Sequence, residues 1–301
     1  KNGYAISVSG EASLNMDDES YLYADKCALY LHDIDFTVDS GNIRGIYIET
    51  TASLTIEGGH ITGTNSIYAV NNKNKATMTG GTISNDEFIN GNIIANRGIN
   101  GGNTTISGGT IYAHTGVYGG TLTMTRGEII SSNTGINGAT ITISGGHIEV
   151  TSEGVHAMEG VSGTINKLTI DSEVHGIFLK RYNKLTVNDI IINSKGEGIY
   201  TYGATLNFYG GEIHSKIALY YTGSSNCFIY DGIIEGSNYG IYNTSYNDIT
   251  IGTKDNDVKD SPVIIGGLYG IYNSNSTAKI KYYDGIIKGV TDATLTDYSE
   301  L

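Results

Sequence analysis

Four tyrosines in the second half of the chain recur at a spacing that would place them in one row. Each follows a small residue and an aliphatic residue, and the four are Tyr200, Tyr220, Tyr242 and Tyr272. If every copy is a strand beside the next, the aliphatic residue points inward and the tyrosine outward, because side chains alternate along a strand. Exposed phenol rings suit the apolar faces of sugars, and their hydroxyls can bond to sugar hydroxyls. The row indicates carbohydrate binding; the alternative is that the tyrosines only stabilise neighbouring strands.

A second row of candidate residues follows the glycine pairs of the sequence. Alignment of the repeats places Glu128, His147 and Glu173 on successive copies. A carboxylate beside a histidine supplies an acid and a base a few ångströms apart. Glycoside cleavage uses two carboxylates roughly 5 to 9.5 Å apart, a separation that Glu128 and Glu173 would span. The other interpretation is an ordinary solvated polar face, so no catalytic residue is assigned.

An interruption of the repeats, Gly252 to Val263, is polar and carries Asp255, Asp257 and Asp260. Carboxylate oxygens are the ligands that Ca²⁺ prefers in proteins. Calcium at these three residues is therefore the only cofactor that the sequence suggests. The histidines and cysteines lack the spacing of zinc ligands, so no zinc is expected.

The residues that must position these side chains form a repeating unit, seen most clearly from Thr140 to Ala157. It contains a short alternating strand, a Gly145-Gly146 corner, a second strand, a polar turn and the triplet Gly154-Val155-His156. Similar units follow one another about every 17 to 22 residues, the period of solenoid proteins. Strands laid beside their equivalents would form three parallel sheets around an aliphatic core. The sequence predicts an all-β fold, a single-stranded right-handed parallel β-helix (solenoid) of about twelve coils.

The triplet that ends each unit sets the expected register of the strands. It combines a small residue, an aliphatic residue and, in most copies, a tyrosine. Among its copies are Gly45-Ile46-Tyr47, Ser66-Ile67-Tyr68, Gly116-Val117-Tyr118, Gly135-Ile136-Asn137, Gly154-Val155-His156, Gly176-Ile177-Phe178 and Gly198-Ile199-Tyr200. A degenerate copy is expected near Ile93-Ile94-Ala95.

One domain is expected over residues 1–301. Residues 1–26 are expected to form an N-terminal cap or lead-in coil, 252–263 a loop insertion and 290–301 the C-terminal end. A second enlarged loop is expected from Asn85 to Ile99, because this segment is longer than its neighbours.

Composition excludes several classes of partner. The chain carries 31 acidic against 18 basic residues, a formal net charge of −13, which repels nucleic acid. Its apolar runs are shorter than the ~20 residues of a membrane-spanning helix, so no membrane insertion is expected.

Cys27 and Cys227 lie about ten repeats apart, too far for a disulfide at a strand spacing of roughly 4.8 Å. Two free thiols are predicted.

Several repeats resemble those of a known fold superfamily. TISGGTI (Thr105 to Ile111), TISGGHI (Thr142 to Ile148), YDGIIEG (Tyr230 to Gly236) and YDGIIKG (Tyr283 to Gly289) are similar to repeats of pectin-lyase-like parallel β-helices. The closest likeness is to Gly-rich repeat regions of secreted or surface proteins of Gram-positive bacteria. The resemblance implies an extracellular or cell-surface location. It leaves the activity open, because the superfamily includes lyases and hydrolases as well as non-catalytic binders and adhesins.

The resemblance and the tyrosine row together favour a non-catalytic protein that binds a polysaccharide or glycan, or acts as an adhesive rod. Two alternatives remain open at this point. One is a polysaccharide lyase or glycoside hydrolase, although none of the arginines lies in the acidic, calcium-binding cluster that the superfamily's lyases use. The other is a structural spacer or fibre subunit that associates with itself end to end or laterally.

Overall fold

The computed structural model describes residues 4–24, 27–63, 68–84, 88–89, 92–93, 97–151, 155–254, 260–275 and 277–295. Every regular element among them is a strand, and all but one pair of strands associate in parallel. The strands form a β-solenoid of about twelve turns, which confirms the predicted fold class; the hand of the winding stays a prediction. Packing divides the chain into two compact units, Lys1–Ser152 and Glu153–Leu301. A single domain over 1–301 therefore stays a prediction, and each unit is described by itself.

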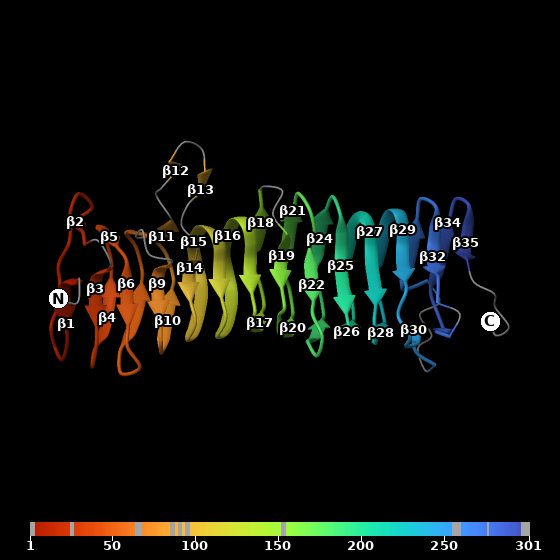
Figure 1. The fold of residues 1–301 in the computed structure, drawn as a ribbon, viewed down its shortest axis with the longest axis horizontal. Helices are drawn as coiled ribbons and strands as arrows, with labels where there is room; N and C mark the ends of the chain where they lie inside the picture. Colours follow the sequence, from red (N-terminus) through yellow and green to blue (C-terminus); the bar gives the residue numbers. More distant parts are fainter. Residues whose placement is uncertain are drawn as a thin grey trace. The chain divides into compact units, whose positions relative to one another are not determined.

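In the first unit the strands stack in three columns, and Figure 1 draws them from red to yellow. The first column contains β4 (Asp35–Val38), β7 (Ser53–Ile56), β10 (Lys75–Met78), the start of β15 (Asn103–Tyr118), the start of β16 (Thr121–Asn137) and β17 (Thr140–Ile143). The second contains β2 (Tyr21–Leu22), β5 (Asn42–Arg44), β8 (His60–Thr62), β11 (Thr82–Ser84), the middle of β15 and β16, and β18 (His147–Val150). The third contains β1 (Tyr4–Val8), β3 (Cys27–Leu31), β6 (Ile46–Ile48), β9 (Tyr68–Asn72), β14 (Arg97–Asn100) and the ends of β15 and β16.

The second unit repeats this plan (Figure 1, green to blue). Its first column contains β20 (Ser162–Ile165), β23 (Lys184–Val187), β26 (Thr205–Phe208), β28 (Asn226–Ile229), β30 (Ile249–Ile251) and β33 (Ile280–Tyr282). Its second contains β21 (Thr169–Ser172), β24 (Ile191–Ser194), the starts of β27 (Glu212–Thr222) and β29 (Ile233–Asn243), β31 (Val263–Gly266) and β34 (Ile286–Gly289). Its third contains β19 (His156–Glu159), β22 (Ile177–Leu179), β25 (Glu197–Tyr202), the ends of β27 and β29, β32 (Tyr269–Asn273) and β35 (Asp292–Leu295).

The core is a set of aliphatic side chains stacked from coil to coil. In β7 the sequence Ser-Leu-Thr-Ile alternates outward and inward, and both Leu54 and Ile56 are buried. Leu54 lies opposite Ala76 of the next coil, and Ile56 opposite Met78. Each fully buried side chain of this size contributes about 1.5–3 kcal/mol. The strands are therefore held by burial between neighbouring coils rather than by any coil alone.

Glycine turns the corner between the first and second columns because no other residue fits. Gly81 has a φ of 69°, and a Cβ atom placed on it would lie 2.6 Å from the carbonyl oxygen of Gly58 in the preceding coil. Gly146 has a φ of 118° at the equivalent corner. Both the left-handed backbone and the close approach of the neighbouring coil require glycine.

The register corrects three of the predicted third-column triplets. Tyr47 lies opposite Asn71, so the copy in β9 is Ala69-Val70-Asn71 and not Ser66-Ile67-Tyr68. Ile99 lies opposite both Val70 and Val117, which makes Gly98-Ile99-Asn100 the copy expected near Ile93-Ile94-Ala95. The same small-aliphatic pattern occurs at several places in the longer turns, and only packing decides between them.

The third correction falls at the start of the second unit. Met158 lies opposite Ile177 and Glu159 opposite Phe178, so the triplet here is Ala157-Met158-Glu159. Val155, predicted to be a core residue, is 47% exposed, whereas Met158 is fully buried. His156, predicted to point outward, is only 6% exposed. The preceding polar turn is three residues longer than the alignment assumed.

The two predicted insertions are described in part. β12 (Phe88–Ile89) and β13 (Asn92–Ile93) form a short antiparallel pair outside the three columns, within the segment Asn85 to Ile99. In the loop 252–263, residues 255–259 lie outside the described part of the chain. The lead-in region already contains column strands, because β1 pairs with β3 and β2 with β5.

Candidate functional site

The four predicted tyrosines lie side by side in the third column of the second unit. Tyr200 of β25 is opposite Tyr220 of β27, Tyr220 is opposite Tyr242 of β29, and Tyr242 is opposite Tyr272 of β32. All four side chains are half-buried and follow an inward-pointing aliphatic residue. We call these four residues the tyrosine stripe. Phe178 of β22 precedes the stripe in the same column.

The rings of the stripe stack on one another. The ring centroids of Tyr200 and Tyr220 are 4.8 Å apart with planes inclined by 17°, and those of Tyr242 and Tyr272 are 5.0 Å apart at 9°. Tyr220 and Tyr242 meet edge to face, at 5.1 Å and 87°. Stacked rings cover each other's faces, so the stripe presents ring edges and hydroxyls. The predicted stacking of sugars on its ring faces is not favoured by this arrangement.

A second row of tyrosines lies beside the stripe. Tyr239 is opposite Tyr269, and each precedes a stripe residue by three positions. The Tyr239 ring lies 5.1 Å from that of Tyr242, and the Tyr269 ring lies 5.6 Å from that of Tyr272. We call Tyr239, Tyr242, Tyr269 and Tyr272 the tyrosine quartet. The motif Tyr-Gly-Ile-Tyr, which occurs at both 239–242 and 269–272, is the sequence signal for it.

The hydroxyls of Tyr200 and Tyr242 stay protonated at physiological pH, because the pKa of each is raised above the usual tyrosine value. Burial raises the pKa of Tyr200, and the neighbouring Tyr220 and Glu197 add to the effect. Burial likewise raises the pKa of Tyr242, with further contributions from Tyr272, Tyr220 and Tyr239. A neutral phenol can both donate and accept a hydrogen bond. The rows therefore offer a set of paired donors and acceptors to a hydroxyl-rich ligand.

The predicted acid-base row is only partly assembled. Glu128 of β16 is opposite His147 of β18, and Glu128 Oε1 lies 3.2 Å from His147 Nδ1. Glu173 belongs to the second unit and pairs with Lys195. Thr169 is opposite Ile191, which is opposite Glu212, so Glu173 lies four residues beyond the position that the alignment gave it. Its assignment to that row is wrong.

A different histidine in the second unit joins two carboxylates. His214 Nε2 lies 3.3 Å from Glu212 Oε2, and His214 Nδ1 lies 3.0 Å from Glu235 Oε2 of the next coil. All three side chains are well exposed on the outer face of the second column. This group was not predicted from the sequence, although Glu-Ile-His at 212–214 aligns with Ile-Ile-Glu at 233–235.

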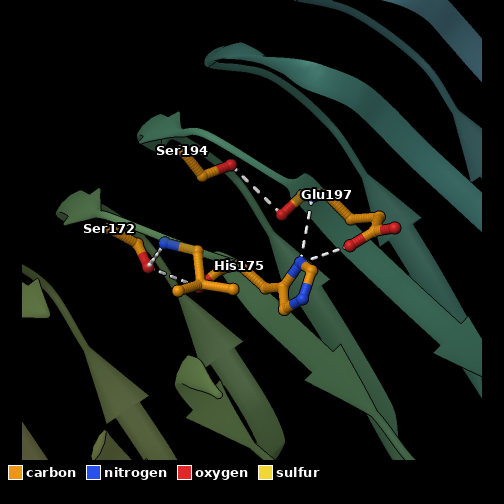
Figure 2. A network of polar contacts seen from close by, with 5 residues as sticks. Ser172, His175, Ser194 and Glu197 are labelled. Atoms are coloured by element: carbon orange, nitrogen blue, oxygen red, sulfur yellow. Dashed lines mark hydrogen bonds and ion pairs between the residues drawn. The ribbon is translucent and has the colours of Figure 1, made fainter. Parts of the chain in front are cut away.

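Figure 2 shows a network in which serine, histidine and glutamate come together. His175 Nδ1 contacts the Glu197 carboxylate, and this contact is the main reason that the Glu197 pKa is lowered. The Ser172 hydroxyl, however, donates to the backbone carbonyl of His175 at 2.7 Å, and the Ser194 hydroxyl donates to the carbonyl of Glu197 at 3.1 Å. A nucleophilic serine must bond to the histidine ring. These serines instead fix the turns that lead into β22 and β25.

His156 is a buried titratable residue at the start of the same column. Its ring lies 4.8 Å from that of Phe178 and 5.2 Å from that of His175. Burial lowers its pKa to about 4, and the neighbouring His175 acts in the same direction. Its Nδ1 atom has no hydrogen-bond partner among the described residues. The imidazole is therefore neutral near pH 7.

The predicted calcium ligands are only partly described. Asp255 and Asp257 lie outside the described residues, and Asp260 lies in an exposed turn. Among the residues that the structure describes, no group of three or more histidine, cysteine, aspartate or glutamate side chains could hold a metal ion. Both cysteines are free, as predicted, and the structure buries both of them. Burial raises the pKa of Cys27 to about 11 and also raises that of Cys227.

The described surface includes one small cleft in the first unit, of about 200 Å³, lined by residues such as Met16, Phe36 and Ser40. Pockets for small molecules usually measure about 300–1,000 Å³, and none of the predicted site residues lines this cleft.

The described part of the chain contains no helix that is long and apolar enough to span a membrane. Comparison with protein-family models, curated proteins and solved structures finds no match to this chain.

Proposed function

We propose that this protein is a non-catalytic, extracellular or cell-surface β-solenoid that binds a carbohydrate along the tyrosine rows of its second unit. The observation that carries the proposal is the register of the rows, with Tyr200, Tyr220, Tyr242 and Tyr272 on adjacent strands and Tyr239 and Tyr269 beside them. Six phenol groups from four consecutive strands form a surface that is both aromatic and rich in hydroxyls.

The geometry favours recognition by hydrogen bonds rather than by stacking. The ring faces of the stripe are taken up by neighbouring rings, while one tyrosine recurs on each of the strands, which are spaced about 4.8 Å apart. Each hydroxyl can donate to one sugar hydroxyl and accept from another. Because stacking already restricts the rings, little side-chain entropy is lost on binding. An extended glycan lying across several coils would engage several hydroxyls at once.

Charge and repeat pattern support an extracellular glycan as the ligand class. A formal net charge of −13 opposes binding to phosphate backbones. It does not repel an uncharged glycan. The TISGGxI repeats resemble those of pectin-lyase-like β-helices, a superfamily in which carbohydrate ligands are common. Membership of that superfamily and an origin in Gram-positive bacteria are part of the proposal.

A structural role for the stripe is the second candidate, and the ring stacking favours it. Aromatic pairs at these separations contribute about 0.5–1.5 kcal/mol beyond their buried area. Tyr200, Tyr220 and Tyr242 would then stabilise the coil stack without contacting any ligand. The two roles differ in what the outward hydroxyls do.

A glycan array tests the proposal directly. The native chain is compared with the triple variant Tyr200→Ala, Tyr220→Ala, Tyr242→Ala, and with Tyr112→Ala as a matched control. Tyr112 is an exposed tyrosine of the first unit, at 44% exposure. The proposal expects the native chain and the control to retain the same glycans and the triple variant to lose them. A native chain that retains no glycan, or a triple variant that retains them all, contradicts it.

A further inference from the structure

Three exposed tyrosines lie where strands of the third column end: Tyr202 is the last residue of β25, and Tyr182 and Tyr246 lie in the turns after β22 and β29. Tyr182 is 84% exposed, Tyr246 is 68% exposed and Tyr202 is 43% exposed. Within the described residues, the rings of Tyr182 and Tyr246 contact no other aromatic ring and no cation. We call Tyr182, Tyr202 and Tyr246 the turn row. In contrast to the stripe, Tyr182 and Tyr246 have no other ring stacked on their faces within the described residues.

These turns lie next to one another along the solenoid. The backbone N–H of Tyr182 donates to the carbonyl of Gly203 at 3.0 Å, and Gly203 donates to Thr222 at 3.3 Å. The N–H of Tyr246 donates to the carbonyl of Gly223 at 2.9 Å. Tyr182 is therefore one coil from Tyr202, and Tyr246 is two coils further, which corresponds to steps of about 5 and 10 Å.

Two buried serines make this row of turns rigid. The Ser225 hydroxyl accepts the N–H of Gly203 at 2.9 Å and donates to the carbonyl of Thr222 at 2.7 Å. The Ser245 hydroxyl donates to the carbonyl of Gly223 at 2.9 Å. Loops held in this way present their side chains in a fixed arrangement. The backbone that carries the exposed rings is therefore held in place by hydrogen bonds to these two serines.

The ring of Tyr202 lies beside the backbone at Gly223. Two ring carbons of Tyr202 lie 3.5 Å from the position that a Cβ atom of Gly223 would occupy. The guanidinium of Arg181 lies 5.6 Å from the centre of the same ring. The Tyr202 ring is therefore bordered by the backbone at Gly223 and by Arg181, and it is less open than the rings of Tyr182 and Tyr246.

Tyr182 is held in a backbone conformation that tyrosine disfavours. It is the third residue of a turn in which the N–H of Asn183 donates to the carbonyl of Lys180, and its φ is 71°. Glycine or asparagine is the usual residue at such a position. An exposed tyrosine here gains almost no burial in return for the strain, so its ring has no evident role in stability. Such outliers gather at binding sites.

We propose that the turn row binds the apolar faces of sugar rings in an extended, linear oligosaccharide. This inference rests on the proposed carbohydrate binding and deepens it, because it assigns ring-face contacts to the turns and hydroxyl contacts to the stripe. Tyrosine rather than leucine or isoleucine forms the row, which suits a ligand with both apolar faces and hydroxyls. The row spans several coils, so it fits an oligosaccharide and not a single sugar.

The test uses the full chain and linear cello-, chito-, xylo- and manno-oligosaccharides, from disaccharide to hexasaccharide. Affinity is measured by titration calorimetry and folding by the melting temperature. For the best-bound series, the native chain is expected to gain affinity with oligosaccharide length. The double variant Tyr182→Gly, Tyr246→Ala is expected to weaken hexasaccharide binding by roughly tenfold. Tyr182→Gly removes backbone strain, so it should not lower the melting temperature while it weakens binding.

The outcomes separate this inference from the function on which it rests. Unchanged hexasaccharide affinity in the double variant, together with a loss in the stripe variant, overturns the turn row and leaves the proposed function standing. An affinity that does not grow with length also overturns it. A native chain that binds none of the oligosaccharides and no glycan on an array contradicts the proposed function itself. The control Tyr112→Ala should bind as the native chain does.

Discussion

The ring of Tyr242 lies parallel to the ring of Tyr272 on the neighbouring coil, with 5.0 Å between centroids and 9° between planes. The two residues are in register on β29 and β32. This pairing means that each tyrosine of the stripe contributes through two separable parts. The ring stabilises the stack of coils, and the hydroxyl faces outward.

Replacing Tyr242 by alanine or by phenylalanine should therefore have different effects on stability. Tyr242→Ala removes contacts with the rings of Tyr220, Tyr239 and Tyr272 and should cost about 2–4 kcal/mol of unfolding free energy. Tyr242→Phe keeps the ring and should cost less than about 1 kcal/mol. Urea unfolding of the two variants measures the difference. Equal losses would show that ring stacking does not stabilise this column.

The glycine corners should tolerate no side chain. Gly81→Ala forces both a left-handed φ and a contact of 2.6 Å with the carbonyl oxygen of Gly58. Gly138→Ala is the matched control, because Gly138 has a similar φ of 68° but open space around its Cβ position. Strain alone costs on the order of 1–3 kcal/mol, so Gly81→Ala should lower the melting temperature distinctly more than Gly138→Ala. Similar shifts would mean that the coils separate easily at the corner.

His156 should make the second unit sensitive to acid. Burial lowers its pKa from 6.5 to about 4 in the folded chain, so between these values the unfolded chain binds the extra proton. The contribution of neutral His156 to the free energy of unfolding is fully present above pH 6.5. It is lost as the pH drops toward 4, by on the order of 3 kcal/mol. His175, Glu159, Glu197 and Lys180 are the charged or titratable groups around it.

The variant His156→Phe isolates this effect. Glu197, whose pKa is lowered chiefly by its contact with His175, loses its own contribution at lower pH in both proteins. The fall in melting temperature between pH 7 and pH 4.5 should be smaller in His156→Phe than in the native chain. The control His214→Gln, at an exposed histidine, should behave as the native chain does. Parallel pH profiles for all three proteins would exclude His156 as the acid-sensitive group.

No polysaccharide cleavage is expected, even though Glu212, His214 and Glu235 could supply acid and base groups. These side chains lie open to water on an outer sheet face, with no enclosed cleft of the described residues around them to bind a sugar and exclude water. Incubation with linear polysaccharides should release neither reducing ends nor unsaturated products. Release by the native chain that disappears in Glu212→Gln would establish the hydrolase or lyase alternative instead.

The solenoid could be predicted because its causes are local and repeat along the chain. Alternation such as Ser-Leu-Thr-Ile at 53–56 predicts a strand with one buried face, and glycine pairs such as Gly80-Gly81 predict a corner. The predicted register was wrong at Tyr68 and at His156. At both places the sequence contains two candidate triplets of a small and an aliphatic residue, and the prediction chose the earlier one. Packing of Val70 and Met158 against neighbouring coils decides these cases.

Less of the candidate site than of the fold could be predicted from the sequence. The order Tyr200, Tyr220, Tyr242, Tyr272 follows from the repeat alone, but whether rings stack or expose their faces depends on rotamers set by neighbouring coils. The exposed ring of Tyr182 depends on the φ of a single turn residue. Glu173 was misplaced by four residues because its alignment crossed one of the long turns.

The most direct test of the central claim is the glycan affinity of the triple variant Tyr200→Phe, Tyr220→Phe, Tyr242→Phe. This variant keeps the stacked rings and removes three outward hydroxyls, so its melting temperature should stay close to that of the native chain. Titration calorimetry with the glycan that the native chain binds best should show a loss of roughly tenfold or more in affinity, since each hydrogen bond contributes about 0.5–1.5 kcal/mol. Native affinity in this variant would contradict the claim that the stripe binds carbohydrate through its hydroxyls.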